Sequence, residues 1–160
     1  KLAFSENAQK VGMPLIPCRE AKHIWTQTRI IEDAVFGTDL TGANIIVSGG
    51  LGMGSRENFK KLHTLADMLG AAVGASRAAV AAGYAGYAHQ VGQTGVSVRP
   101  DIYIAFGISG AVQHLSGISG AKKIYAVNHD PKAPIHEYAD FSVIADCTSV
   151  LDKLIEKAGG

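Results

Sequence analysis

The sequence predicts an α/β fold, a doubly wound and mainly parallel sheet with helices on both of its faces. Three observations support this prediction. From residue 44 onward, short apolar runs alternate with segments of helical periodicity. The runs are continuously apolar, as is expected of strands buried on both faces of a sheet. Glycine-rich turns follow them, and 14 of the 19 glycines lie between Gly49 and Gly120.

The first strand and the first helix have clear boundaries. Residues 44–48 (NIIVS) form a β-branched run that ends at Gly49-Gly50, as a buried strand would. Ser55 is a favourable N-cap, and Gly70 can close the helix that follows it. The residues expected on the buried face of this helix are apolar and share helical spacing: Phe59, Leu62, Leu65, Ala66 and Leu69.

The remaining elements repeat this alternation. Strands are predicted at 71–73, 101–106, 123–128 and 141–145, and helices at 77–82, 111–116 and 149–157. Because strand and helix alternate, the strands are expected to be parallel and joined by crossovers. The segment Gly-Ile-Ser-Gly-Ala occurs at 107–111 and again at 117–121. Only the first copy follows a strand and opens a helix, so only that copy is expected to form an anion-binding turn.

Residues 1–39 differ from the rest of the chain. They lack a sustained period or a clear core face, although Thr26–Phe36 could form a strand. The polar cluster at 38–42 has the composition of a turn or linker. We therefore expect an N-terminal segment, or the remnant of a preceding domain, at 1–39 and a second domain at 40–160. Since the sequence does not begin with Met, a fragment or a processed chain is expected.

Composition excludes several classes of protein. A hydrophobic fraction of 47% and a charged fraction of 18% exclude disorder, and a net charge of +1 without a basic stripe argues against nucleic acid. No apolar run approaches the ~18 residues of a membrane span. Cys18 and Cys147 lack CxxC partners, which predicts free thiols rather than zinc ligands. No metal-ligand spacing occurs among the remaining histidines: His23, His63, His89, His129 and His136.

The residues that could bind a ligand lie at the ends of the predicted strands. In an open α/β sheet, ligands bind beyond the carboxyl ends of the strands. Here these ends are rich in glycine, hydroxyl and amide groups and poor in carboxylates, which suits binding phosphates, ribose and a polar ring better than hydrolysis. Neither GxGxxG nor a Walker motif is present. The turn at 49–54 could be a phosphate loop or a strand-to-helix turn that needs a positive φ.

Five motifs occur in order at these turns: Ser-Gly-Gly at 48–50, Gly-Ala-Ser-Arg-Ala-Ala-Val at 74–80, Gln-Val-Gly-Gln-Thr-Gly at 90–95, Gly-Ile-Ser-Gly-Ala-Val-Gln-His-Leu at 107–115, and Val-Asn-His-Asp-Pro-Lys-Ala-Pro-Ile at 127–135. Together, over residues 40–157, they closely resemble the FAD-binding C-terminal domain of the electron transfer flavoprotein alpha subunit. The resemblance implies a Rossmann-like domain around an extended FAD, with the isoalloxazine near a partner beta subunit.

The resemblance also implies which residues contact the cofactor. Ser76 and Arg77 match the pair near the flavin and the pyrophosphate. The turn that contacts the flavin and the ribityl chain, with the Thr94 hydroxyl near N5, is matched by Val91, Gly92, Gln93 and Thr94. The phosphate-binding turn and first helical turn, which bring His114 towards the pyrimidine end, are matched by Ser109, Gly110, Ala111, Val112, Gln113 and His114.

Three further positions complete the set. Asn128 and Asp146 match contacts to the adenosine part, and Cys147 follows where the family often has an apolar residue. One position departs from the family: Leu51 stands where Arg usually follows Ser-Gly-Gly. Losing this cation removes a charge-assisted contact worth about 1.5–3 kcal/mol. FAD would then be held more weakly, or a partner subunit would supply the cation.

The implied function is electron transport rather than catalysis on a substrate. Electrons would come from dehydrogenases, of the acyl-CoA type or similar, and pass to a quinone oxidoreductase or a related acceptor, in the bacterial cytoplasm or the mitochondrial matrix. From residue 68 to 121 the only formal charges are Arg77, Arg99 and Asp101, so one arginine beside a flavin would strongly favour its reduced, anionic states. Two alternatives remain: an NAD-dependent enzyme of the deacylase or transhydrogenase type, and a structural module without a cofactor.

Overall fold

The protein folds around a five-stranded, entirely parallel sheet. The computed structural model describes residues 39–159. The strand order is β2-β1-β3-β4-β5, which confirms the predicted doubly wound α/β fold. The strands are β1 (Ile45–Gly49), β2 (Ala72–Ala75), β3 (Ile102–Phe106), β4 (Lys123–Asn128) and β5 (Phe141–Ile144). The strand expected at 26–36 and the cysteine at position 18 lie outside the described residues.

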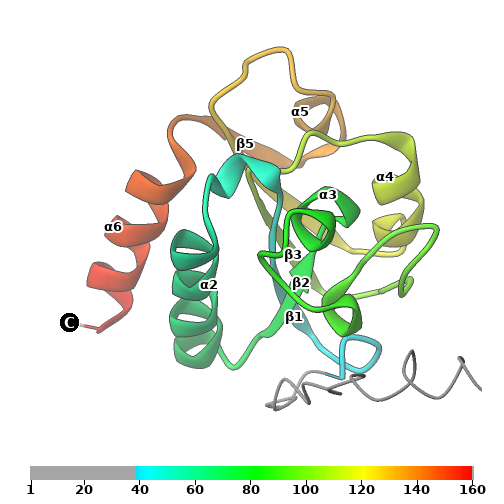
Figure 1. Ribbon diagram of the computed structural model, residues 1–160, viewed down its shortest axis with the longest axis horizontal. Helices are drawn as coiled ribbons and strands as arrows, with labels where there is room; N and C mark the ends of the chain where they lie inside the picture. The colour runs from blue at the N-terminus through cyan, green and yellow to red at the C-terminus, as the bar shows by residue number, and fades with distance from the viewer. Residues whose placement is uncertain (1–38, 160) are drawn as a thin grey trace, which may run out of the picture. The chain divides into compact units, whose positions relative to one another are not determined.

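Helices cover both faces of this sheet (Figure 1). They are α2 (Arg56–Leu69), α3 (Arg77–Ala81), α4 (Val112–Ile118), α5 (Ile135–Tyr138) and α6 (Cys147–Gly159), with short 3₁₀ turns at Leu51–Met53 and Tyr87–His89. Successive side chains of a strand point to opposite faces of the sheet, so the strands contribute to two core layers. Ile46 and Tyr103 face the layer that contains α4, while Val47 and Phe106 pack with α2 and α6.

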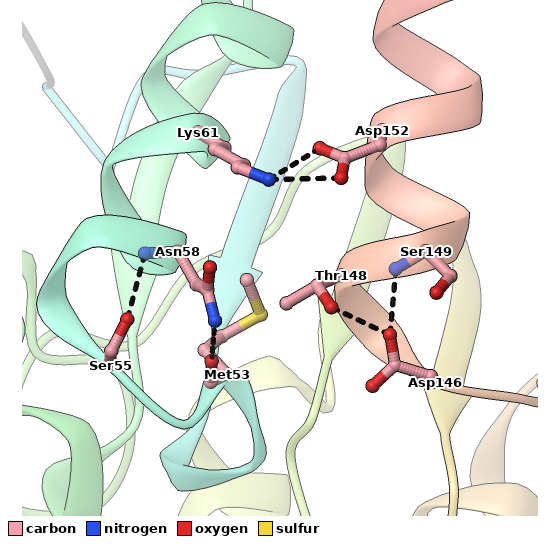
Figure 2. A network of polar contacts seen from close by, with 8 residues as sticks. All are labelled: Met53, Ser55, Asn58, Lys61, Asp146, Thr148, Ser149 and Asp152. Carbon is pink, nitrogen blue, oxygen red and sulfur yellow. Dashed lines mark hydrogen bonds and ion pairs between the residues drawn. The ribbon is translucent and has the colours of Figure 1, made fainter.

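Helix α2 begins and ends where the sequence predicts. The Asn58 N–H donates to Ser55 Oγ over 3.1 Å, and Gly70 closes the helix with a left-handed φ of 60°. Three of the side chains expected on its buried face, Phe59, Leu62 and Leu65, are at most 2% exposed. Figure 2 shows this N-cap, and beside it the 2.7 Å ion pair from Lys61 on α2 to Asp152 on α6.

Differences from the predicted elements are confined to short segments and element ends. Helix α6 starts at Cys147, two residues before the predicted start, because the Asp146 carboxylate caps it from outside the apolar pattern. Helix α5 has four residues, too few for a helical period to be visible in the sequence. Within residues 39–159, no helix is both long and apolar enough to cross a bilayer.

Candidate functional site

Strands β1 and β3 are neighbours although β2 separates them in sequence, so the strand order changes direction between them. Such a point is where open α/β sheets bind ligands. Here the turns after the two strands are joined by hydrogen bonds, from Gly50 N to Phe106 O (2.8 Å) and from Gly52 N to Gly107 O (3.0 Å). Space for a ligand is therefore found beside this junction rather than inside it.

The glycines of this junction bring two backbone segments together. A Cβ on Gly50 would lie 2.1 Å from Gly107 O, and a Cβ on Gly52 would lie 2.8 Å from Gly107 Cα. Gly54, at the end of the turn, has a φ of 78°. Of the two interpretations of residues 49–54, the structure supports the strand-to-helix turn that needs a positive φ.

Two pockets lie at the carboxyl ends of the strands, and both include Ala78. The first pocket has a volume of about 410 Å³ and is lined by Arg77, Ala78, Ala81, Val91, Gly92, Gln93, Thr94, Ala111, Gln113 and His114. The second pocket has a volume of about 480 Å³ and is lined by Leu51, Gly52, Ser76, Ala78, Gly107, Ser109, Asn128, His129, Asp130, Ala133 and Pro134. Ala78 lines both pockets, which places them next to each other.

The structure gathers most of the predicted contact residues around these pockets. Eight of them line the first pocket: Arg77, Val91, Gly92, Gln93, Thr94, Ala111, Gln113 and His114. Ser76, Ser109 and Asn128 line the second pocket. Four predicted positions line neither pocket, namely Gly110, Val112, Asp146 and Cys147. The contact of any of these residues with a cofactor stays a prediction.

Gly92, which also lines the first pocket, allows the turn at 91–94 to pack against α4. Its φ is 134°, and a Cβ there would lie 2.8 Å from Gln113 O. The Thr94 hydroxyl accepts from Gln90 Nε2 over 2.9 Å, and the Tyr87 hydroxyl donates to the Thr94 carbonyl over 2.7 Å. The turn therefore holds Thr94 in place and leaves its own O–H free to donate.

Arg77 is the only residue with a formal charge in the lining of the first pocket. It is the first residue of α3, whose N-cap is Ser76, with the Ser76 Oγ accepting from Ala79 N over 3.2 Å. No acid of residues 39–159 forms an ion pair with Arg77. Most of the other lining groups are alanine, valine and glycine, so no neighbouring charge in the lining offsets this cation.

His114 reaches the first pocket from α4 as a neutral ring. The residue is 6% exposed, and its Nε2 lies 3.0 Å from the Tyr103 hydroxyl. Burial lowers the pKa of His114 to about 4, and the Val91 backbone opposes this shift. At neutral pH the ring therefore carries no charge and offers one N–H donor and one acceptor.

The segment between β3 and α4 offers a row of free backbone donors. Among the described residues, none accepts a hydrogen bond from the N–H groups of residues 109–113. Gly110 turns this segment with a φ of 85°, and the Ser109 carbonyl is fixed by the N–H of Ile135 over 3.0 Å. Consecutive free N–H groups next to a pocket are suited to phosphate oxygens. The second pocket, which Ser109 lines, is therefore suited to an anionic group such as phosphate.

Asn128 and Cys147 mainly hold the structure around the second pocket. Asn128 Nδ2 donates to the Ile108 carbonyl over 2.9 Å, and its Oδ1 accepts from Asp130 N over 3.0 Å. The buried Cys147 thiol donates to the Val127 carbonyl over 3.2 Å, and burial raises its pKa. Both residues therefore fix the ends of β3 and β4, on which the shape of the pocket depends.

Five residues that line the second pocket belong to the sequence motifs but were not named as contacts: Gly107, His129, Asp130, Ala133 and Pro134. His129 and Asp130 follow directly after β4, so their position at a strand end was a usable signal. Ala78 and Ala81 carry no chemical signal at all, because alanine lines a pocket only by leaving space. Within residues 39–159, no three His, Cys, Asp or Glu side chains are arranged to hold a metal ion.

Asp146 serves as the N-cap of α6 (Figure 2). Its Oδ1 accepts from Thr148 Oγ1 over 2.6 Å and from Ser149 N over 2.8 Å. These hydrogen bonds, with the Thr148 hydroxyl the largest contributor, lower the pKa of Asp146 to about 2. Because the folded-state pKa is depressed, the ionised cap stabilises the fold at pH values above about 4, the ordinary pKa of an aspartate. This stabilisation is lost as the pH falls towards 2.

We expect Thr148→Val to raise the pKa of Asp146, because the valine keeps the shape of threonine and removes its hydroxyl. The measurement is an NMR titration of the Asp146 carboxyl between about pH 1.5 and 6. Thr148→Ser is the control, since it keeps a hydroxyl that can donate to the Asp146 carboxylate. Equal titration midpoints for the wild type and Thr148→Val would show that the Thr148 hydroxyl does not lower the pKa of Asp146.

Comparison with known proteins agrees with this geometry. The family model described as "Electron transfer flavoprotein FAD-binding domain" matches residues 39–119. The chain is 55% identical over 119 residues to the mitochondrial electron transfer flavoprotein subunit alpha of Oryza sativa subsp. indica, covering 74% of this chain and 33% of the relative. It is 51% identical over 128 residues to the alpha subunit of Bacillus subtilis (80% and 39%) and 54% identical over 119 residues to that of Paracoccus denitrificans (74% and 39%). The chain thus spans less than half the length of these relatives.

Proposed function

Because this chain belongs to the electron transfer flavoprotein alpha-subunit family, we propose that its residues 40–160 hold FAD across the two pockets as part of an electron carrier. FAD is the cofactor named for the matching domain. One observation carries the proposal: an apolar pocket with a single cation adjoins a second pocket that lies beside a row of free N–H groups. This is the donor set that a flavin joined to a pyrophosphate requires.

The described residues divide into groups by the part of the cofactor that each would hold. Arg77, His114 and the turn at 91–94 would contact the flavin ring. The N–H groups of residues 109–113 would bind the phosphates, and Asn128 with Asp146 would contact the adenosine. FAD supplies the capacity to accept and release electrons singly or in pairs. The chain supplies a cation, oriented donors and a largely apolar wall.

The lining of the first pocket supports a carrier that performs no substrate chemistry of its own. It contains no carboxylate and no thiol, and its one imidazole is neutral and bonded to Tyr103. A general acid or base would need a group that titrates near neutral pH. Arg77 instead favours negative charge in the pocket, which makes reduction of a flavin there easier.

The partners follow from the family and are part of the proposal. A beta subunit would complete a heterodimer. Dehydrogenases of the acyl-CoA type or similar would deliver electrons, and a quinone oxidoreductase or a related acceptor would remove them. The named relatives include mitochondrial and bacterial alpha subunits, which supports the mitochondrial matrix or the bacterial cytoplasm as the compartment.

Electron relay by the heterodimer tests this proposal. The alpha and beta chains are co-expressed, and the flavin absorbance near 450 nm is followed. It should bleach on addition of an acyl-CoA together with a catalytic amount of acyl-CoA dehydrogenase, and recover when a quinone oxidoreductase and quinone are added. Acyl-CoA alone should have no effect. Bleaching by acyl-CoA without the dehydrogenase would show an enzyme with its own substrate and would overturn the carrier role.

Leu51 offers a prediction about affinity. Its side chain is 53% exposed and lines the second pocket, at the position where the family usually has arginine. We expect Leu51→Arg to tighten FAD binding by the heterodimer about tenfold, because the new guanidinium can make a charge-assisted hydrogen bond in this exposed position. Fluorescence titration of the apoprotein with FAD measures the Kd. Leu51→Gln is the neutral control, and an equal effect of the two variants would exclude the charge as the cause.

A further inference from the structure

A chain of buried polar side chains extends from the sheet to the first pocket. Ser48 lies on β1 and Tyr103 on the neighbouring strand β3, and both are 0% exposed. In the strand register Tyr103 pairs with Ile46, so the side chains of Tyr103 and Ser48 project from the same face of the sheet. The Tyr103 hydroxyl lies 3.0 Å from Nε2 of His114, and the two rings are tilted by 56° with centroids 6.1 Å apart. Three elements thus place three polar groups in one otherwise apolar layer.

The protonation of this chain follows from its surroundings. Burial raises the pKa of Tyr103 far above neutral pH, so its phenol keeps its proton. Ser48 Oγ makes no hydrogen bond to any residue of 39–159, so Nε2 of His114 is the partner that the described residues give the Tyr103 phenol. The proton of Tyr103 is then directed towards His114 Nε2, which accepts it with its lone pair.

The opposite arrangement fits the structure less well. If Nε2 of His114 carried the proton, Nδ1 would present a lone pair to the Val91 backbone. That backbone raises the pKa of His114, as a carbonyl that favours an N–H does. Nδ1 has no hydrogen-bond partner among the described residues in either tautomer, but a proton on Nε2 would also leave the buried Tyr103 O–H without an acceptor. The geometry therefore favours a proton on Nδ1 and a lone pair on Nε2.

We propose that Tyr103 is a positioning residue that fixes His114 as the neutral Nδ1–H tautomer beside the first pocket. The inference rests on the proposed function, because it concerns the charge next to a bound flavin. With Nε2 occupied by the phenol, His114 cannot take up a proton there without breaking a buried hydrogen bond. Arg77 from α3 is the one formal charge in the pocket lining, and β1, β3 and the turn at 91–94 contribute none. Tyr103 thus adds to the burial that keeps His114 uncharged, and with it the charge of the pocket constant, near neutral pH.

Nitrogen NMR of the histidine rings tests this inference in the FAD-loaded heterodimer, grown with ¹⁵N-histidine. The His114 signals are assigned by their loss in His114→Gln. In the wild type we expect a protonated Nδ1 and an unprotonated Nε2 from pH 6 to 8. In Tyr103→Phe the ratio of the two tautomers should fall about fivefold, which corresponds to one neutral hydrogen bond. The ring should also begin to protonate at a higher pH, and the reduction potential of the flavin should then vary with pH in that range.

Tyr125→Phe is the matched control, because it removes a tyrosine hydroxyl from the adjacent strand β4. It should leave the His114 signals unchanged. A wild-type spectrum with the proton on Nε2 would overturn the proposal even if Tyr103→Phe failed to assemble. An unchanged tautomer ratio in a folded Tyr103→Phe heterodimer would also overturn it. A heterodimer without flavin, but with the Nδ1–H tautomer, would instead contradict the proposed function and leave the role of Tyr103 intact.

Discussion

Replacing Gly50 with alanine is expected to destabilise the protein by at least about 3 kcal/mol and to abolish cofactor binding. The new Cβ would lie 2.1 Å from the Gly107 carbonyl oxygen and 2.8 Å from Ile108 Cα. Both are backbone atoms, so no side chain can rotate away. The hydrogen bond from Gly50 N to Phe106 O would have to break, and the junction between β1 and β3 would open. The thermal unfolding midpoint and the flavin content of the heterodimer measure the two effects.

Gly83→Ala is the matched control for this substitution. Gly83 has a positive φ of 76°, but nothing lies within 4 Å of the position of its Cβ. It should therefore cost only the ~1–2 kcal/mol of a left-handed backbone, without loss of flavin. If Gly50→Ala were no more destabilising than Gly83→Ala, the two turns would not be packed as tightly as described.

Replacing Arg77 with alanine is expected to lower the reduction potential of the bound flavin by about 60 mV or more. This value corresponds to a tenfold change in a one-electron equilibrium, at the low end of what one charge-assisted hydrogen bond contributes. We choose the low end because Arg77 is exposed in the isolated chain. The fold should remain intact, since Arg77 is not part of either core cluster. A redox titration of the heterodimer measures the shift.

Two further variants separate charge from other effects of this substitution. Arg77→Lys keeps the positive charge and should retain most of the potential. Arg99→Ala removes the other cation of the charge-poor stretch, at a position that lines neither pocket, and should change the potential little. An unchanged redox titration of Arg77→Ala with FAD still bound would exclude the proposed electrostatic role.

Much of the fold could be predicted because its elements carry strong local patterns. The five strands are apolar runs, and α2 has a serine cap, an amphipathic face and a closing glycine. The candidate contact residues could be named because motifs at the strand ends resemble those of a known family. These motifs do not reveal packing. The glycines at 50 and 52 were open to two interpretations, and only the structure shows their backbone against Gly107.

The parts that could not be predicted depend on contacts between distant segments. In the sequence Tyr103 is an ordinary strand residue, because the sequence pattern does not show that its hydroxyl contacts His114 on α4. The motif comparison also gave no sign that Asp146 Oδ1 caps α6, while the contact of Asp146 with a cofactor stays a prediction. Short elements such as α5 fall below the length at which periodicity is visible.

The cofactor content of the co-expressed alpha–beta heterodimer tests the central claim most directly. The purified complex is denatured, and the released small molecules are identified by absorbance and mass. We predict FAD, with flavin bands at about 370 and 450 nm before denaturation. Gly50→Ala, purified in parallel, should contain none. A folded wild-type complex that binds NAD and no flavin would contradict the assignment of the two pockets to FAD.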